Sequence, residues 1–156
     1  MTTTVRDSAI NVRSATPEDV PAIERLLTSS SLPTDGVAEA VCDFLIAAAG
    51  DDVVGVVGME YCGSFGLLRS TAVAPGWRGK GIARKLVERI IAEAELRGVH
   101  ALYLLTTTAE AYFPSFGFSK TTRDAVPSEI RDTGEFRTAC PASATVMCLT
   151  LPVTSR

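Results

Sequence analysis

Glycines alternate with cationic residues in the segment Arg78-Gly79-Lys80-Gly81, and this segment has the clearest potential for chemistry in the chain. A helix is predicted to begin directly after it, with Ile82 and Ala83 as its first residues. Glycines allow the backbone to approach a ligand closely. The unpaired N–H groups and the dipole at a helix N-terminus bind phosphate groups. The segment therefore predicts a site for a polyanion that is held largely by main-chain groups.

The placement of charge around this helix N-terminus supports the same prediction. Arg78, Lys80, Arg84 and Lys85 all lie there. A cation at the positive end of a helix is disfavoured by about 0.3 to 1 kcal/mol. A bound diphosphate reverses the sign of that interaction. The alternative interpretation is an ordinary strand-to-helix turn with solvated charged residues, and the four cations favour anion binding over it.

Two common nucleotide-binding motifs do not fit the segment. A P-loop requires Gly-x-x-x-x-Gly-Lys followed by Ser or Thr, which is absent. The dinucleotide motif Gly-x-Gly-x-x-Gly requires a third glycine where this chain has Arg84. ATPase and Rossmann-type functions are therefore not expected.

The segment is positioned by a strand on one side and a long helix on the other. The strand is predicted over Leu67 to Ala74 and ends at Pro75-Gly76. The helix has apolar residues at helical spacing from Ile82 to Ala94 and stops at Arg97-Gly98. A second strand, Ala101 to Thr107, follows with an apolar centre that is typical of a strand covered on both faces.

The rest of the chain has shorter predicted elements, which together indicate an α/β fold with a mixed sheet. In chain order they are a strand at Ile10 to Arg13, a helix from Thr16 to about Leu27, a helical turn at Val37 to Val41, strands at Cys42 to Ala48 and Val53 to Glu60, a short helix capped by Thr108 from Ala109 to about Phe116, a helical turn at Ser128 to Arg131 within the irregular segment 119–141, and a last strand at Ala144 to Leu151.

Length, composition and the lack of targeting segments lead us to expect a single cytoplasmic domain. The 156 residues, 46% of them apolar, are enough for a single core, so we expect one domain over residues 1–156 with residues 1–8 flexible. The formal net charge of −3 argues against an obligate nucleic-acid binder. No signal peptide or apolar run of 18 residues is found, so we expect no membrane association.

The cysteine and histidine content argues against metal chemistry. The single histidine is His100, and none of the cysteines forms a C-x-x-C pair, so no metal site is predicted. The lone histidine also leaves little basis for a Ser-His-Asp or Cys-His catalytic site. We expect reduced thiols that behave as small apolar side chains. The cysteines are Cys42, Cys62, Cys140 and Cys148.

The segment 78–83, placed after a strand that ends Ala72-Val73-Ala74-Pro75, resembles the Arg/Gln-x-x-Gly-x-Gly/Ala signature of the GCN5-related N-acetyltransferase (GNAT) superfamily. Residues 111–118 resemble the short helix ending in Gly-Phe of that family. The resemblance implies a mixed, mostly antiparallel central sheet with flanking helices and a splayed acetyl-CoA cleft. It also implies that the main-chain N–H groups from Arg78 to Ala83 hold the diphosphate of acetyl-CoA. The pantetheine arm would pair with the strand edge at Ala72 and Val73 and place the thioester between this strand and the one at Ala101 to Thr107.

Weaker similarities point to a small acceptor. Residues 104–108, 112–113 and 117–118 are similar to the acetyltransferase part of bacterial N-acetylglutamate synthases. Residues 126–131 and 140–144 resemble the N-acetyltransferases of arsenic-resistance operons. These resemblances imply an amino-acid-like amine such as glutamate, phosphinothricin or arsinothricin, and a role in arsenic or toxin resistance. An acyl-CoA-binding sensor without turnover and an acetyltransferase for protein lysines or N-termini are the alternatives. A homodimer is left open.

Three residues are candidates for binding the acceptor. Arg69 lies within an apolar strand, where its guanidinium could bind a carboxylate through two hydrogen bonds. Its alternative role is a salt bridge or a side chain that reaches the outer surface. Ser70 and Thr106 could add hydrogen bonds, although strand threonines also reflect β-propensity.

No catalytic residue is assigned from the sequence. Many members of the GNAT family have a carboxylate early in the fourth strand and a tyrosine four residues before the glycine of Gly-Phe, and here these positions are Leu67 and Phe113. Tyr112 is adjacent but lies about 100° around the helix, so we interpret it as a packing residue. Glu60 could act through a water molecule or could be an exposed carboxylate at a strand end.

Overall fold

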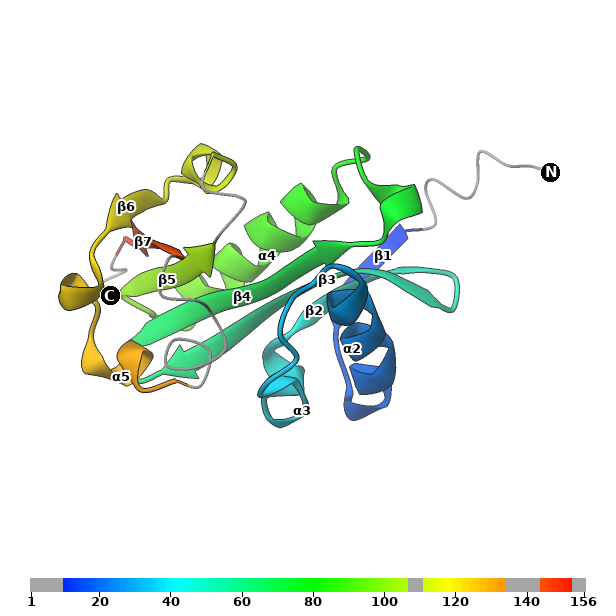
Figure 1. The fold of residues 1–156 in the computed structure, drawn as a ribbon, viewed down its shortest axis with the longest axis horizontal. Helices are drawn as coiled ribbons and strands as arrows, with labels where there is room; N and C mark the ends of the chain where they lie inside the picture. The colour runs from blue at the N-terminus through cyan, green and yellow to red at the C-terminus, as the bar shows by residue number, and fades with distance from the viewer. Residues whose placement is uncertain (1–9, 107–110, 134–143, 153–156) are drawn as a thin grey trace. The chain divides into compact units, whose positions relative to one another are not determined.

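The structure is a computed structural model that describes residues 10–106, 111–133 and 144–152. In the described residues, seven strands are hydrogen-bonded in the order β1-β2-β3-β4-β5-β7-β6 (Figure 1). The pairing of β4 with β5 is parallel, whereas β1–β2, β2–β3, β5–β7 and β6–β7 are antiparallel. The predicted α/β class with a mixed, mostly antiparallel sheet is confirmed. The strands are β1 Ile10–Ser14, β2 Leu45–Ala49, β3 Asp52–Cys62, β4 Phe65–Val73, β5 Ala101–Thr106, β6 Ser119–Thr121 and β7 Thr145–Thr150.

The described α-helices are fewer than the described strands, and most of them are short. Only α2 and α4 exceed two turns among the described residues. The α-helices are α2 Val20–Ser29, α3 Val37–Ala40, α4 Ile82–Leu96 and α5 Ser128–Arg131, and the 3-10 turns are Pro17–Asp19, Val41–Asp43, Pro75–Trp77, Phe113–Phe116 and Arg123–Ala125. No helix in the described ranges is long and apolar enough to cross a bilayer.

The chain divides into two compact units that are not continuous in sequence. Among the described residues, unit 1 contains those from Ile10 to Gly58 and from Ser70 to Ile90. Unit 2 contains Met59 to Arg69 and the described residues from Ile91 onward. The chain passes from one unit to the other inside β3, β4 and α4, at residues 58/59, 69/70 and 90/91.

In unit 1, the two faces of the strands are covered by different helices. On one face, α2 and α3 lie side by side (Figure 1) and their buried residues Ile23, Leu27 and Val37 pack with strand residues such as Ile46 and Val56. On the other face, the first turns of α4 lie so close to β3 that a Cβ at position 55 would be 3.0 Å from Ile82 and 3.1 Å from Leu86. Gly55 therefore allows the start of α4 to pack directly against the sheet.

The start of α2 is fixed by polar contacts. Thr16 and Asp19 form a capping box, in which the Thr16 N–H donates to Asp19 Oδ2 at 2.8 Å. Arg13 on β1 donates to the same oxygen at 2.9 Å. This hydrogen bond is the main reason that the pKa of Asp19 lies below its usual value. The predicted helix from Thr16 is thus correct, although its first turn, Pro17–Asp19, is a 3-10 turn.

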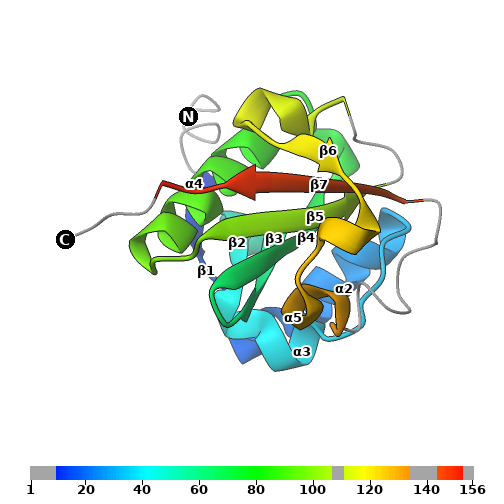
Figure 2. The ribbon, with the colours of Figure 1, turned by 90° about the vertical axis from the view of Figure 1, so that its left-hand side faces the viewer.

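In unit 2, β5 lies between β4 and β7 (Figure 2). Its side chains on one face join an apolar cluster that α5 and the preceding turn cover through Ile130 and Val126. The described members of this cluster are Leu67, Ala101, Tyr103, Val126, Ile130 and Val146, with Cys62, Phe65, Leu105 and Cys148 packed against it.

Three local predictions differ from the structure. The strand predicted from Cys42 begins at Leu45, because residues 41–43 turn as a 3-10 helix before the chain becomes extended. The strand β6 was not predicted, since its sequence Ser119-Lys120-Thr121 is polar and forms an edge that pairs only with β7. The helix predicted at Ala109 to Phe116 begins outside the described residues, and its described end is a 3-10 turn over Phe113–Phe116.

Candidate functional site

The loop between β4 and α4 is held by a short series of hydrogen bonds within unit 1. The N–H of Ala74 donates to the carbonyl of Val54 at 2.8 Å, and the N–H of Trp77 donates to the carbonyl of Ala74 at 2.8 Å. The side chain of Arg78 then donates its Nε–H to the carbonyl of Val73 at 2.9 Å. These bonds fix where the chain leaves β4 and how it approaches the first turn of α4.

The two glycines of the loop have the left-handed backbone that other residues rarely adopt. Gly79 and Gly81 both have φ of +80°. A Cβ added at either position would meet no atom within 4 Å. Backbone conformation, and not lack of space, is therefore what requires glycine here. The open space beside both glycines leaves their main-chain groups accessible to a ligand.

The first turn of α4 has main-chain N–H donors, and the charged side chains of this turn and of the loop before it are all cationic. The carbonyl of Gly81 accepts from the N–H of Lys85 at 3.1 Å, so the helical hydrogen bonds begin at Gly81. The N–H groups of the first turn have no carbonyl within the helix to pair with. Acidic residues are absent from this turn. Arg78, Lys80, Arg84 and Lys85 are all exposed, and Arg84 forms a long contact of 3.3 Å with Glu88 one turn along the helix.

The remaining candidate residues of unit 1 lie in β4 and at the start of α4. Ala72 and Val73 are buried at the end of the strand. Ile82 is buried against β3, so its side chain anchors the helix. Ser70 has φ of +61°, an uncommon left-handed conformation for a serine inside a strand. This conformation interrupts the regular alternation of β4 directly after Arg69.

Unit 2 contains the other two acceptor candidates, Arg69 and Thr106. Arg69 is a buried charged residue, and its Nη1 donates to Oε2 of Glu60 at 2.5 Å. The salt bridge that the sequence left open as the alternative role of Arg69 is therefore present. Thr106 lies at the end of β5 opposite Thr145, half-buried.

No pattern in the sequence indicates directly that Glu60 and Arg69 are partners. They are nine residues apart on β3 and β4, which are joined by the turn at Gly63 and Ser64. The only signal was the presence of one acidic and one basic residue in two adjacent apolar strands. Glu60 is therefore not the exposed strand-end carboxylate that was one of its two expected roles, because only 19% of its side-chain surface is exposed.

Unit 2 also contains a buried tyrosine that sequence reasoning did not consider. Tyr103 on β5 is directly opposite Cys148 on β7. Burial, followed by the effect of Cys148, raises the pKa of Tyr103 to about 12. Tyr103 is therefore a neutral phenol throughout the physiological range. Burial also raises the pKa of the Cys62 thiol, with smaller contributions from the negative charges of Glu60 and Glu129.

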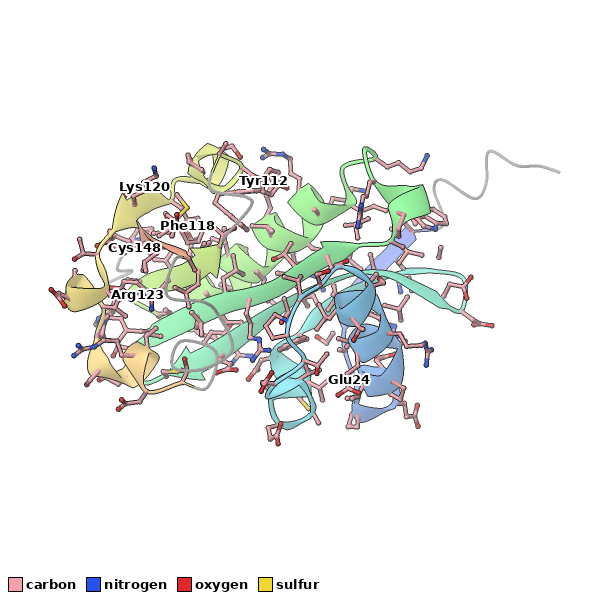
Figure 3. The ribbon with its side chains drawn as sticks, viewed as in Figure 1. Glu24, Tyr112, Phe118, Lys120, Arg123 and Cys148 are labelled. Carbon is pink, nitrogen blue, oxygen red and sulfur yellow. The ribbon has the colours of Figure 1, made fainter. Side chains whose placement is uncertain are left out.

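The positions where the family resemblance suggests acid and base groups are apolar and buried. Leu67 and Phe113 both lie in the interior. Tyr112 is labelled in Figure 3. Its ring packs edge-to-face on Phe113, with centroids 5.4 Å apart, and on Phe116, with centroids 5.2 Å apart. The interpretation of Tyr112 as a packing residue agrees with these contacts.

The described residues hold no group of three or more His, Cys, Asp or Glu side chains that could bind a metal ion. Of the four cysteines, Cys42 is exposed and Cys62 and Cys148 are half-buried, each as a free thiol. Residues 140–143, which include Cys140, lie outside the described residues, and so does Thr108.

Comparison with known proteins places these features in a family. Residues 40–120 match the family model described as an acetyltransferase (GNAT) domain. The chain is 32% identical over 147 residues to an amino-acid acetyltransferase of Mycobacterium tuberculosis, covering 85% of this chain and 81% of that protein. It is 29% identical over 127 residues to an uncharacterized N-acetyltransferase of Chlorobaculum tepidum, covering 76% of this chain and 81% of that protein.

Solved structures show the same fold. Rv2747 of Mycobacterium tuberculosis, solved in complex with CoA and NLQ, superposes with a TM-score of 0.77 at 25% identity and covers 91% of this chain and 99% of its own. N-acetylglutamate synthase of Neisseria gonorrhoeae, solved with coenzyme A and N-acetyl-glutamate, gives a TM-score of 0.78 at 20% identity. That match covers 92% of this chain but 35% of the synthase chain, and at this identity it supports the fold alone.

Proposed function

Because the chain belongs to the GNAT family of acetyl-CoA-dependent N-acetyltransferases, we propose that it transfers an acetyl group from acetyl-CoA to the amino group of a small, amino-acid-like acceptor. The observation that supports acetyl-CoA binding is the arrangement of residues at the start of α4. Exposed cations there surround main-chain N–H groups that follow two glycines of positive φ.

In this proposal, unit 1 holds the coenzyme. The N–H groups from Arg78 to Ala83 bind the diphosphate, and the cations around them compensate its charge. The edge of β4 at Ala72 and Val73 pairs with the amides of the pantetheine arm, as an added strand would. Acetyl-CoA supplies an activated acyl group as a thioester.

The reaction itself needs the acceptor as a free amine. Its nitrogen forms a bond to the acetyl carbonyl carbon, the carbon–sulfur bond breaks, and the CoA thiolate takes up a proton. One further proton is released to the solvent for each acetylated ammonium ion. Holding both substrates in line can supply much of the rate acceleration. Such catalysis is compatible with apolar residues at positions 67 and 113.

The proposed acceptor class rests on the relatives. The curated relative with 32% identity is an amino-acid acetyltransferase, and the structure with 25% identity was solved with CoA and NLQ. Glutamate, which the sequence resemblance implies, is the first acceptor to test, followed by its analogues phosphinothricin and arsinothricin. Acetylation of either analogue would also support a role in toxin or arsenic resistance.

Release of free CoA with a panel of amines tests this function. Turnover with a free amino acid supports it, and mass spectrometry of the product shows which nitrogen carries the acetyl group. Tight binding of acetyl-CoA without turnover on any amine would instead indicate a sensor, the alternative that the apolar Leu67 and Phe113 leave open. Turnover with peptides alone would indicate a protein acetyltransferase.

A further inference from the structure

We propose that Glu60 binds the ammonium group of the acceptor and that Arg69 acts on the acceptor only by positioning Glu60. This inference rests on the proposed function, since it names the group in unit 2 that recognises an amine. It differs from one of the two roles that the sequence left open for Arg69, in which the guanidinium contacts the acceptor directly.

The exposure of the two side chains separates their roles. Arg69 has 1% of its side-chain surface exposed, whereas Glu60 has 19%. A guanidinium that is enclosed to this degree offers no surface to a carboxylate arriving from solution. Of the two partners, Glu60 is the one whose side chain has surface open to solvent.

The hydrogen bonding of Glu60 leaves one of its oxygens available. Oε2 accepts the hydrogen bond from Arg69 Nη1. Within the described residues, no hydrogen bond to Oε1 is recorded. A carboxylate oxygen can accept two hydrogen bonds, and an ammonium group offers three donors. Glu60 is thus held in place through one oxygen while the other can take a charge-assisted hydrogen bond from an amine.

The surroundings of the pair argue against a purely stabilising role. Glu60 and Arg69 lie beside the apolar cluster of unit 2, whose member Leu67 is fully buried on the same strand as Arg69. Removing two charges from water costs several kcal/mol, and a buried ion pair is often no more stable than apolar residues of the same volume. A buried arginine paired with a glutamate whose side chain is still partly exposed is better explained by recognition of a cation.

The negative charge of Glu60 acts on its neighbours in unit 2. It contributes to the raised pKa of Cys62, together with burial and the charge of Glu129. Glu129 on α5 is the natural comparison, because it is exposed and lies close enough to affect the same thiol. Glu60 differs from Glu129 in being held by a buried guanidinium.

The test compares an amine with its des-amino analogue. L-glutamate serves as the acceptor, and glutarate, which keeps both carboxylates but has no ammonium group, serves as a competitive inhibitor. If the amine panel selects another amino acid, its own des-amino acid replaces glutarate. For Glu60→Gln, KM for the acceptor should rise about 10- to 100-fold, the range expected for loss of a hydrogen bond between charged groups. The inhibition constant of glutarate and KM for acetyl-CoA should change less than about twofold, within the scatter of single contacts.

Glu129→Gln is the matched control, since it removes the same charge near Cys62 and should leave all three constants unchanged. Glu60→Asp keeps the carboxylate and should recover part of the loss. A rise in the glutarate inhibition constant equal to the rise in KM would show a general disturbance of the site and would overturn the assignment. Unchanged acceptor kinetics in Glu60→Gln would overturn it as well. Absence of turnover by the wild-type protein with every amino acid would instead contradict the proposed function.

The role of Arg69 needs a variant that leaves Glu60 intact. Arg69→Met removes the charge and keeps most of the side-chain volume. If Arg69 positions Glu60, this variant should raise KM for the acceptor and leave the inhibition constant of glutarate unchanged. If Arg69 itself binds the acceptor carboxylate, the variant should weaken glutarate as much as the acceptor, and the positioning role would be wrong. Thermal unfolding of each variant checks that the fold is retained.

Discussion

Arg78 donates its Nε–H to the carbonyl oxygen of Val73, which lies 2.9 Å away at the end of β4. The bond ties the glycine loop back to the strand that it leaves. A single arginine therefore fixes the conformation of the loop and also adds charge at the cationic end of α4. Lys80 adds a similar charge two residues later, and no such side-chain hydrogen bond is recorded for it within the described residues.

Arg78→Ala should weaken acetyl-CoA binding more than Lys80→Ala. Both variants remove one positive charge, but the first also releases the loop from Val73. We expect a loss of about tenfold or more for Arg78→Ala and a few-fold for Lys80→Ala, from the usual free energies of a hydrogen bond and a helix-end charge. Calorimetric titration with acetyl-CoA at two salt concentrations measures both. Equal losses in the two variants would show that the bond to Val73 has no role in binding.

Gly81→Glu should abolish acetyl-CoA binding and leave the fold intact. The new Cβ meets no atom within 4 Å, so the change causes no clash. The positive φ of +80° costs about 1 to 2 kcal/mol for a residue with a side chain. The carboxylate adds repulsion for a diphosphate at the helix entry. Circular dichroism checks that the fold is retained, and calorimetric titration measures the loss of acetyl-CoA binding.

Gly50→Ala is the control for backbone strain in the Gly81 experiment. Gly50 lies in the turn between β2 and β3, has φ of +62°, and its added Cβ also meets nothing within 4 Å. Its loss of stability should resemble that of Gly81→Ala, while its affinity for acetyl-CoA should equal that of the wild type. Wild-type affinity in Gly81→Glu would mean that the coenzyme is bound elsewhere.

The sequence was most informative where local rules decide the structure. The break at Gly81 and the helical spacing from Ile82 onward predicted the start of α4 correctly, since a glycine with positive φ and a run of apolar residues act within a few residues of each other. The short strand β6 could not be found in this way. Its polar residues are extended because β7 pairs with them, and that pairing joins distant parts of the chain.

The same distinction applies to the candidate site. The cations of the loop are visible as a cluster in the sequence, and the structure shows them exposed at the start of α4, but binding of an anion there stays a prediction. The partnership of Glu60 with Arg69 depends on how two strands lie beside each other. The left-handed backbone of Ser70, directly after Arg69, is equally hard to predict. A positive φ at a serine inside a strand is not favoured by any local preference. Tertiary structure imposes it, and sequence patterns therefore gave no sign of it.

The stability of the protein should fall between pH 10 and about pH 12 through Tyr103. The pKa of Tyr103 in the folded protein is raised from 10.0 to about 12, chiefly by burial. Folding therefore favours the neutral phenol. The contribution of this phenol to the free energy of unfolding is complete below its ordinary pKa of 10.0. It is lost as the pH rises through the pKa of about 12 in the folded protein.

Chemical denaturation at a series of pH values measures this dependence, with Tyr103→Phe as the comparison. The variant should show a flatter profile in the alkaline range, and the difference in phenolate absorbance between the two proteins should titrate near pH 12. Identical profiles for variant and wild type would mean that Tyr103 ionises as readily in the folded chain as in the unfolded one.

Cys62 should react slowly with alkylating reagents near neutral pH, because burial and two carboxylates disfavour its thiolate. Glu60→Gln should increase the rate of alkylation of Cys62 more than Glu129→Gln, since the charge of Glu60 has the larger effect on this thiol. Mass spectrometry of the peptide containing Cys62 after timed exposure to iodoacetamide measures the rate. The exposed Cys42 is an internal reference in each sample. A Cys62 rate that is the same in all three proteins would rule out electrostatic coupling between the carboxylates and the thiol.

The chain passes between its two units at residues 58/59, 69/70 and 90/91. These positions determine where a chimera with a related acetyltransferase can be joined without dividing a unit. The glycine loop lies in the sequence between the Glu60–Arg69 pair and most of the apolar cluster of unit 2. A single junction between two parent sequences therefore cannot separate the loop from both of them. A chimera needs three junctions, so that residues 59–69 are transplanted together with the chain from residue 91 onward. If unit 1 binds the coenzyme and unit 2 recognises the amine, as proposed, libraries recombined at these three junctions should keep acetyl-CoA binding and vary the amine that is acetylated.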